Sequence, residues 1–241
     1  MTYKHLFTRA LSANPDRLHF AAHSHHLWPD ASFDGQVEAW EDAARLADLK
    51  WGRIMGPVWE EAQRHIAREL KLPDPSTLSF SPNTHDFLVR IFSAIPKRPV
   101  RVLATDGEFH SFRRQMARWV EAGEAELVNA LANELVATAE AGGFDLIFAS
   151  HVLFNSGAII SELERLAALA KPEGPWVVVD GYHGFMAIET DLSAVADRIF
   201  YLSGGYKYAM AGEGVCFLHA PPGFAPRPLV TGWYAAFDDL A

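Results

Sequence analysis

Short apolar runs alternate with segments whose apolar residues recur at helical spacing along most of the chain. The clearest run, WVVVD at 176–180, is apolar up to its last residue, which is typical of a strand buried on both faces. The pattern predicts strands at 78–81, 100–104, 125–128, 145–150, 176–180, 198–202 and 215–219. It predicts intervening helices at 85–95, 111–122, 131–141 and 161–171. This alternation predicts an α/β fold, a mostly parallel sheet with helices on both faces in three α/β/α layers.

Two further helices are expected before the first strand. Residues 33–49 and 57–71 carry apolar positions at helical spacing with charges between them, and Pro57 suits the first turn of the second helix. The Pro-rich segment 221–228 leaves the sheet at the other end.

Composition narrows the class of protein. The chain has 241 residues, of which 49% are hydrophobic and 21% charged, so a large core is expected without structural metals. A net charge of −9 without a basic stripe argues against nucleic acid or an anionic membrane as partner. Cys216 is the only cysteine, which excludes an internal disulfide and suits a reducing cytoplasm. Neither a signal peptide nor a membrane-spanning apolar run is recognised, so a cytoplasmic protein is expected.

Polar side chains follow the predicted strands, where ligands of parallel sheets gather. Lys207 lies in the glycine-rich segment SGGYKYAMAGEG after one strand, where burial would favour its neutral amine; the alternative is a surface lysine. Asp180 ends the preceding strand, where it could cap a helix, bind a metal or pair with a protonated pyridine ring. Together the two match what pyridoxal phosphate (PLP) requires, a lysine for the aldimine and an acid for the ring nitrogen.

Two weaker signals accompany this pair. Asn83 and Thr84 stand at the start of a predicted helix, where backbone N–H groups favour an anion such as phosphate, although an ordinary helix cap looks the same. Phe109 follows the strand at 100–104 and could stack on a cofactor ring, although a loop aromatic is often a core residue.

The order of these motifs resembles a known family. The motifs NTH, EFHS, SHVLFNSG, VVVDGYH, SGGYKYAMAGEG and TGWY follow one another along nearly the whole chain. They resemble the class V aminotransferase superfamily of fold-type I PLP enzymes, and kynureninases most closely. The D-x-x-H of Asp180–His183 and the Tyr206–Lys207 pair carry most of the likeness. The early AAHSHHLWP resembles the N-terminal substrate loop of that family.

The resemblance implies a role for each matching residue. Lys207 would form the aldimine and move protons, Asp180 would pair with the ring nitrogen, and His183 would lie close to the ring. Phosphate would be bound by Asn83, Thr84 and Tyr206, with Ser111 on the phosphate side. Phe109 would stack on the ring, Asn155 or Ser156 would lie near its 3-oxygen, and Ser24, His25 and Trp233 would face the substrate. No metal is expected.

The chain also departs from the pattern. Phe112 stands where the family usually has Asp, Asn155 where it has Tyr, and His25 and His26 where it has Leu and Gly, which bears on the substrate more than on the cofactor. Family members continue into a small C-terminal domain that supplies an arginine for the substrate carboxylate, so a fragment is expected here. The expected division is 1–60 as an N-terminal segment with the substrate loop, 61–230 as the PLP-binding large domain, and 231–241 as the start of a truncated C-terminal region.

The resemblance thus implies a homodimer with a shared active site, acting on a small-molecule amino-acid substrate by hydrolytic Cβ–Cγ cleavage. Another class V aminotransferase or lyase is an alternative, whereas a cysteine desulfurase is disfavoured because Cys216 lies in an apolar strand. A metal-dependent amidohydrolase could use His23 and His25, with Asp180 and His183 as further ligands. A non-catalytic α/β binding module is the remaining alternative.

Overall fold

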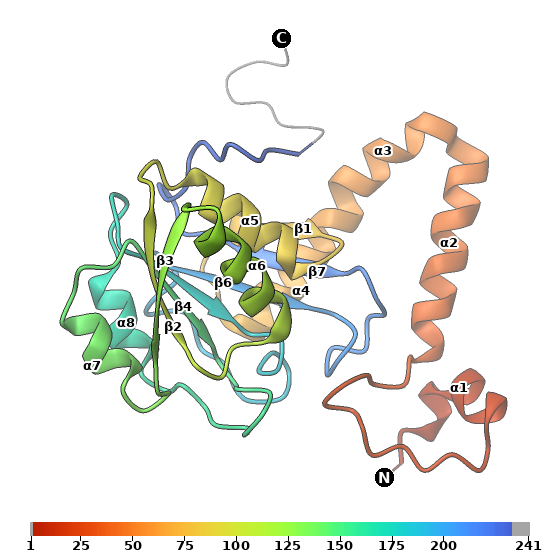
Figure 1. Cartoon of the computed structure of the whole chain (residues 1–241). Coiled ribbons are helices and arrows are strands. Elements are labelled where there is room, and N and C mark those ends of the chain that lie inside the picture. The colour runs from red at the N-terminus through yellow and green to blue at the C-terminus, as the bar shows by residue number, and fades with distance from the viewer. Residues whose placement is uncertain (1, 233–241) are drawn as a thin grey trace.

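The computed structural model describes residues 2–232, which form a seven-stranded sheet with an N-terminal helical segment beside it (Figure 1). The strand order is β1-β7-β6-β5-β4-β2-β3. The strands β2 to β6 run parallel to one another, while β7 runs antiparallel to both β6 and β1. The mostly parallel sheet expected from the apolar runs is confirmed.

Each predicted strand is present, with ends that move by a few residues at most. The strands are β1 (Leu78–Ser81), β2 (Val100–Thr105), β3 (Ala125–Ala130), β4 (Leu146–Ser150), β5 (Trp176–Asp180), β6 (Ile199–Gly204) and β7 (Cys216–His219). Every residue of β4 and β6 is buried, which explains why these strands read as continuous apolar runs rather than alternating ones.

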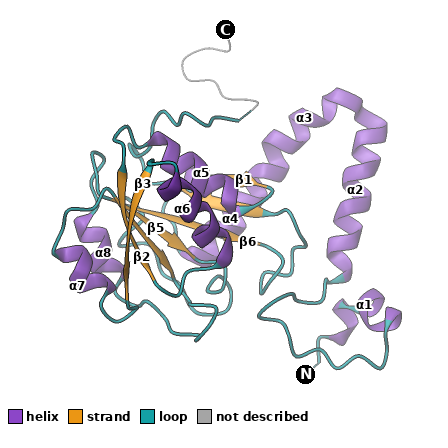
Figure 2. Ribbon diagram, viewed as in Figure 1, coloured by secondary structure: helices purple, strands orange, loops and turns teal. Residues whose placement is uncertain are grey.

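Helices cover the sheet and bury its core. In the view of Figure 2, α5 (Thr84–Ala94) and α6 (His110–Glu121) lie in front of the strands, and α4 (Trp59–Leu70) lies behind them. The short helices α7 (Leu135–Glu140) and α8 (Leu163–Leu169) complete the α/β/α arrangement. One apolar cluster joins these layers, with Phe87 of α5, Phe148 of β4 and Phe200 of β6 among its most buried side chains.

The N-terminal segment extends away from this body as a series of helices (Figure 1). Its elements are a 3₁₀ turn (Lys4–Leu6), α1 (Thr8–Ala13), α2 (Asp30–Leu46), a second 3₁₀ turn (Ala47–Leu49) and α3 (Lys50–Arg53). The sequence pattern predicts α2 but misses α1, which is too short to show periodicity. Pro57 does not begin a helix as expected, because it lies in a π-helical turn (Ile54–Val58) where Gly56 leaves helical geometry, and α4 begins at Trp59.

Among the described residues, none of the helices combines the length and the apolar character that crossing a membrane requires.

Candidate active site

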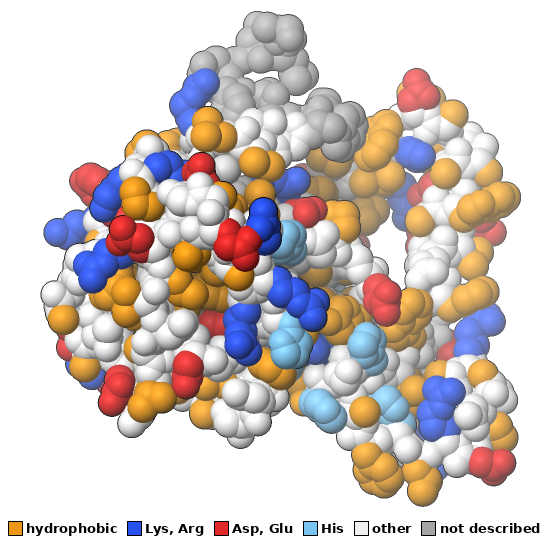
Figure 3. Space-filling model, in the orientation of Figure 1, with side chains coloured by type: hydrophobic (Ala, Val, Ile, Leu, Met, Phe, Trp, Pro, Cys, Tyr) orange, Lys and Arg blue, Asp and Glu red, His pale blue; other side chains and the backbone are white. Residues whose placement is uncertain are grey.

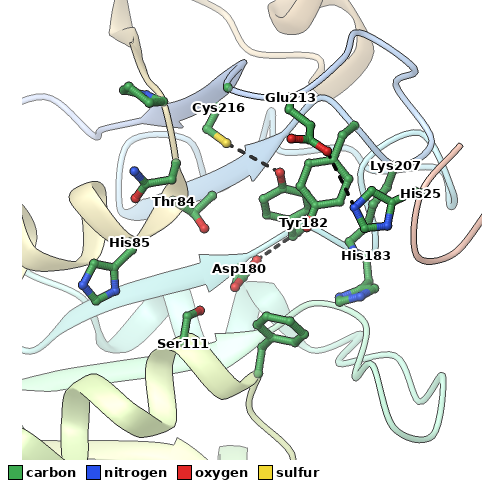
Figure 4. Close-up of a pocket in the computed structure, with 15 residues that line it drawn as sticks. His25, Thr84, His85, Ser111, Asp180, Tyr182, His183, Lys207, Glu213 and Cys216 are labelled. Atoms are coloured by element: carbon green, nitrogen blue, oxygen red, sulfur yellow. Dashed lines mark hydrogen bonds and ion pairs between the residues drawn. The ribbon is translucent and has the colours of Figure 1, made fainter. Parts of the chain in front are cut away.

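A cavity of about 350 Å³ opens at the carboxyl ends of the central strands. It takes residues from the starts of α5 and α6, from the turn after β5, and from the loop between β6 and β7. Its lining consists of His25, Pro82, Asn83, Thr84, His85, Phe109, Ser111, Asp180, Tyr182, His183, Tyr206, Lys207, Glu213, Gly214 and Cys216. Most of the side chains that the sequence singles out therefore lie in one place (Figure 4).

Lys207 is buried in this cavity, with 5% of its surface exposed. The loop that carries it is bent at Gly212 and Gly214, both of which have positive φ angles that glycine adopts without strain. The Lys207 ammonium donates a hydrogen bond to the backbone carbonyl of Ser24 at 3.4 Å. Burial lowers the pKa of Lys207, while the charge of Asp180 opposes that change. The structure therefore provides an amine that loses its proton more easily than a surface lysine.

Asp180 is the last residue of β5 and points into the same cavity (Figure 4). Its Oδ1 accepts a hydrogen bond from the backbone N–H of Tyr182 at 2.9 Å. The pKa of Asp180 is raised to about 7: burial and the charge of Glu108 raise it, while the Tyr182 N–H and Lys207 partly oppose them. A carboxyl group with such a raised pKa would be stabilised by a cationic partner on the cavity side.

The N-terminus of α5 forms another wall. Asn83 caps this helix, because its side-chain oxygen accepts the backbone N–H of Asp86 at 2.9 Å. Thr84 follows as the first helical residue, and its backbone N–H lies in hydrogen-bonding contact with the thiol of Cys216. The helix dipole and the hydroxyl of Thr84 make this wall favourable for an anion.

Aromatic rings border the cavity. Phe109 precedes α6, and its ring centroid lies 6.0 Å from that of His183. Burial, together with the charges of Lys207 and His23, lowers the pKa of His183 to about 4. Ser111, in the first turn of α6, also lines the cavity. His183 is therefore a neutral ring at physiological pH, suited to contacting a planar ligand rather than an anion.

The N-terminal segment reaches the cavity through one loop. The ring of His25 stacks on Tyr206, with centroids 4.7 Å apart, and its Nε2 lies 3.9 Å from a carboxylate oxygen of Glu213. His26 donates its backbone N–H to the carbonyl of Tyr206 at 3.2 Å. Figure 3 shows histidine side chains gathered where this segment meets the body of the molecule. Ser24 and His25 thus lie beside the lysine loop, as the motif order suggests.

Several lining residues were not singled out from the sequence. Tyr182 donates to or accepts from the thiol of Cys216, with the hydroxyl oxygen and sulfur 3.6 Å apart (Figure 4). Its position two residues after Asp180 was a usable signal, whereas Cys216 reaches the cavity only because β7 runs antiparallel to β6. Gly204 leaves the space that the Tyr182 ring occupies, since a Cβ there would collide with that ring.

Other sequence candidates lie elsewhere. Asn155 and Ser156 are exposed in the turn after β4 and are not among the residues that line the cavity. Phe112 is buried and stacks on Phe148 with centroids 4.0 Å apart, which makes it a core residue. Trp233 lies outside the described residues.

The ligand set of the amidohydrolase alternative is not assembled. Across residues 2–232, no three side chains of His, Cys, Asp or Glu come together in a way that could hold a metal ion. The open sheet also differs from the barrel that this alternative requires.

Comparisons with known proteins agree with the fold. No family model matches the chain. Isopenicillin N epimerase of Streptomyces clavuligerus is 29% identical over 192 residues, which cover 75% of this chain and 47% of that protein. The chain therefore spans about half the length of the curated relative that it matches.

Solved structures resemble the chain more completely. The apo cysteine desulfurase of Thermococcus onnurineus NA1 superimposes with a TM-score of 0.71 at 20% identity, covering 96% of this chain and 61% of that chain. A mutant of C-DES with glycine covalently linked to its PLP cofactor gives a TM-score of 0.76 at 16% identity, covering 92% of this chain and 60% of that chain.

These likenesses establish the three-layer fold of the fold-type I large domain. The finer resemblance to kynureninase is not confirmed, because the relatives found are an epimerase and desulfurase-like enzymes.

Proposed function

We propose that this protein is a PLP-dependent enzyme acting on an amino acid. The observation that carries this proposal is the placement of the buried Lys207 amine and the Asp180 carboxyl group in one cavity at the carboxyl ends of β5 and β6. The similarity to the C-DES lyase supports it, since the structure of a C-DES mutant holds glycine covalently linked to its PLP cofactor.

The residues of the cavity fit this cofactor. Asp180 has a raised pKa, and among the described residues its carboxyl group has no cation within hydrogen-bonding distance. The N–H of a pyridinium ring would supply such a cation. Lys207 would hold the cofactor covalently, and the phosphate would lie at Asn83, Thr84, Ser111 and Tyr206. Phe109 and His183 would contact the ring. The roles of Asn155 and Ser156 near the ring's 3-oxygen remain a prediction.

When bound, PLP supplies an electron sink for bonds broken at the substrate Cα. The chain's own part is to place and move protons. Lys207 would take the proton from the substrate Cα, because burial keeps part of its amine neutral. Asp180 would hold the proton of the ring nitrogen in place. Ser24 and His25 would border the substrate from the N-terminal segment.

For the reaction, we propose hydrolytic Cβ–Cγ cleavage of a kynurenine-like amino acid. A second candidate is Cα epimerisation or C–S lysis, which the epimerase and the C-DES lyase among the relatives favour. Cysteine desulfuration by Cys216 is disfavoured, because burial raises the pKa of this thiol and its sulfur is held by Tyr182 and Thr84. We also propose a cytoplasmic homodimer, in which the second chain covers apolar side chains that the N-terminal segment exposes.

Covalent trapping tests the cofactor assignment. The protein is mixed with PLP, reduced with borohydride and digested, and peptide mass spectrometry should find the pyridoxyl group on Lys207. A Lys207→Ala variant should remain unlabelled there, while Lys171, exposed on the surface, serves as the internal measure of non-specific labelling. Labelling spread over surface lysines, with Lys207 unmodified in a folded sample, would overturn the proposal.

The reaction type needs a separate measurement. The loaded protein is incubated in D₂O with kynurenine, cystine or simple amino acids, and NMR follows exchange of the Cα proton. Release of alanine from kynurenine supports Cβ–Cγ cleavage, sulfide or persulfide from cystine supports a lyase, and loss of chirality alone supports an epimerase. An Asp180→Ala variant should retain some PLP through the phosphate contacts but lose Cα exchange.

A further inference from the structure

Glu108 is a buried acid that none of the roles above uses. It lies in the turn between β2 and α6 and is 1% exposed. Its carboxylate accepts hydrogen bonds from the hydroxyl of Thr105 at 2.5 Å and from the hydroxyl of Ser150 at 2.6 Å. The backbone N–H of Ser150 also donates to it, at 3.0 and 3.1 Å to the two oxygens. A buried carboxylate is costly, so an arrangement that satisfies both of its oxygens calls for an explanation.

The contacts of Glu108 join two strand ends. Thr105 is the last residue of β2 and Ser150 is the last residue of the neighbouring parallel strand β4. The backbone register between these strands ends at Ala104 and Phe148. Beyond that point the strands would be free to separate toward the cavity, and the Glu108 carboxylate takes the Ser150 N–H that no β2 carbonyl receives. Glu108 therefore extends the connection between β2 and β4 to the rim of the cavity.

Both ends of this connection lead to the cavity. On one side, Phe109 follows Glu108 directly and precedes α6. On the other side, Ser150 is the register partner of Asp180, and the next residue, His151, donates its backbone N–H to the Asp180 carbonyl at 2.8 Å. We propose that Glu108 is a positioning residue, whose carboxylate clamps β2 to β4 and so fixes Phe109 and Asp180 around the cavity. This deepens the proposed function, since it concerns the two residues assigned to the cofactor ring.

The charge of Glu108 also affects the two ionisable groups of the cavity, Asp180 and Lys207. Burial raises the pKa of Glu108 itself, and its hydrogen bonds from Ser150 and Thr105 oppose that change. Its negative charge contributes to the raised pKa of Asp180, whose charge in turn raises the pKa of Lys207. Removing the Glu108 charge should therefore leave Asp180 more ionised at pH 7 and the Lys207 amine more protonated. A packing role alone would not alter the reactivity of Lys207.

Three variants separate these effects. Glu108→Gln removes the charge while keeping the shape of the side chain. Ser150→Ala removes one donor and leaves the charge, so it covers the case in which Glu108→Gln does not fold. Glu126→Gln is the matched control, since Glu126 is exposed on β3. Thermal unfolding establishes that each variant is folded at the assay temperature.

Two measurements are made on the full chain. The first is the PLP dissociation constant from absorbance, expected to rise about tenfold in Glu108→Gln, by a smaller factor in Ser150→Ala and not at all in the control. The second is pulse acetylation of the cofactor-free protein at pH 7, read at Lys207 by mass spectrometry against the exposed Lys171. Lys207 should react more slowly in Glu108→Gln by a factor of about two or more, because its amine is more protonated.

The outcomes separate the two proposals. If the unmodified protein does not bind PLP at Lys207, the proposed function fails, and the acetylation rates still decide the role of Glu108. If PLP binds but folded Glu108→Gln has an unchanged PLP dissociation constant and unchanged Lys207 reactivity, the positioning role of Glu108 is overturned. If Glu108→Gln is unfolded, an unchanged PLP affinity in Ser150→Ala overturns it, and a weakened affinity supports it.

Discussion

The N-terminal segment and the sheet body of this protein are folded by different means. In residues 2–58, Asp42 is the one described residue that is buried, and Phe20 and Trp40 are 86% and 73% exposed. In the body, whole strands are buried, and Leu103 and Val178 are 0% exposed. Helical hydrogen bonds and surface ion pairs hold the segment, whereas the body is held by apolar burial. The cavity lies where the two regions meet.

That difference assigns different tasks to the two regions. A rigid sheet can hold Asp180 and Lys207 at fixed positions despite the cost of burying their charged groups. The segment contributes Ser24 and His25 through a few polar and aromatic contacts, so its side of the cavity can adjust without disturbing the sheet.

The largest expected effect contrasts one apolar residue from each region. Leu103→Ala should lower the free energy of unfolding by about 3–5 kcal/mol, because it leaves a void in a fully packed strand. Trp40→Ala should change it by less than about 0.5 kcal/mol, because Trp40 packs against little. Urea unfolding followed by fluorescence and circular dichroism measures both. Similar losses in the two variants would show that the regions share one core.

The next effect concerns how much the buried charge of Asp180 lowers the stability of the sheet body. Its folded pKa of about 7 lies above the ordinary value of 3.8, so the folded state holds a proton that the unfolded chain releases. Stability of the cofactor-free protein should therefore fall as pH rises from about 4 to about 7. Asp180→Asn should remove that loss and stabilise the protein at pH 7.5 by on the order of 4 kcal/mol. Melting temperatures of Asp180→Asn and of the unmodified protein at pH 4 and pH 7.5 test this. A difference between the two proteins that is the same at both pH values would contradict it.

A smaller effect tests what holds the segment together. The Asp42 carboxylate is contacted by Arg53 and by Arg45, the latter at 2.7 Å, which ties α2 to α3. Asp42→Ala should destabilise this segment locally by about 1–3 kcal/mol while the body unfolds at its usual denaturant concentration. Hydrogen exchange should show faster exchange in 30–53 and unchanged exchange in β4 and β5. Asp34→Ala, an exposed change on the same helix, is the control.

The smallest effect concerns the junction. His25→Ala removes the stacking on Tyr206 and the pair with Glu213, yet both side chains of that pair are largely exposed, at 60% and 65%. The global free energy of unfolding should change by less than about 0.5 kcal/mol. Limited proteolysis between residues 14 and 29 should nonetheless become faster, whereas His65→Ala on α4 should leave it unchanged. Equal cleavage rates in the unmodified protein, His25→Ala and His65→Ala would show that the stacking of His25 on Tyr206 does not hold this loop.

The sequence predicts the body well and the details of the cavity less well. Buried parallel strands produce continuous apolar runs, so β5 and the Asp180 at its end are recognisable, as is the glycine-rich loop around Lys207. Loop conformation is not encoded in such patterns, so the sequence does not predict that Asn155 is exposed in the turn after β4. Tertiary contacts are equally hidden, and the link from Glu108 to Ser150 joins positions far apart in the chain.

The position of β1 in the sheet bears on how the chain folds. Its neighbour is β7, with Leu78 paired with His219 and Ser81 paired with Cys216, so β1 is synthesised first among the strands and waits for the last one. Such a long loop must close before its contacts repay the entropy lost, which slows folding. During translation, β1 therefore has no strand partner until β7 has left the ribosome. The lysine loop between β6 and β7 is completed in the same late step.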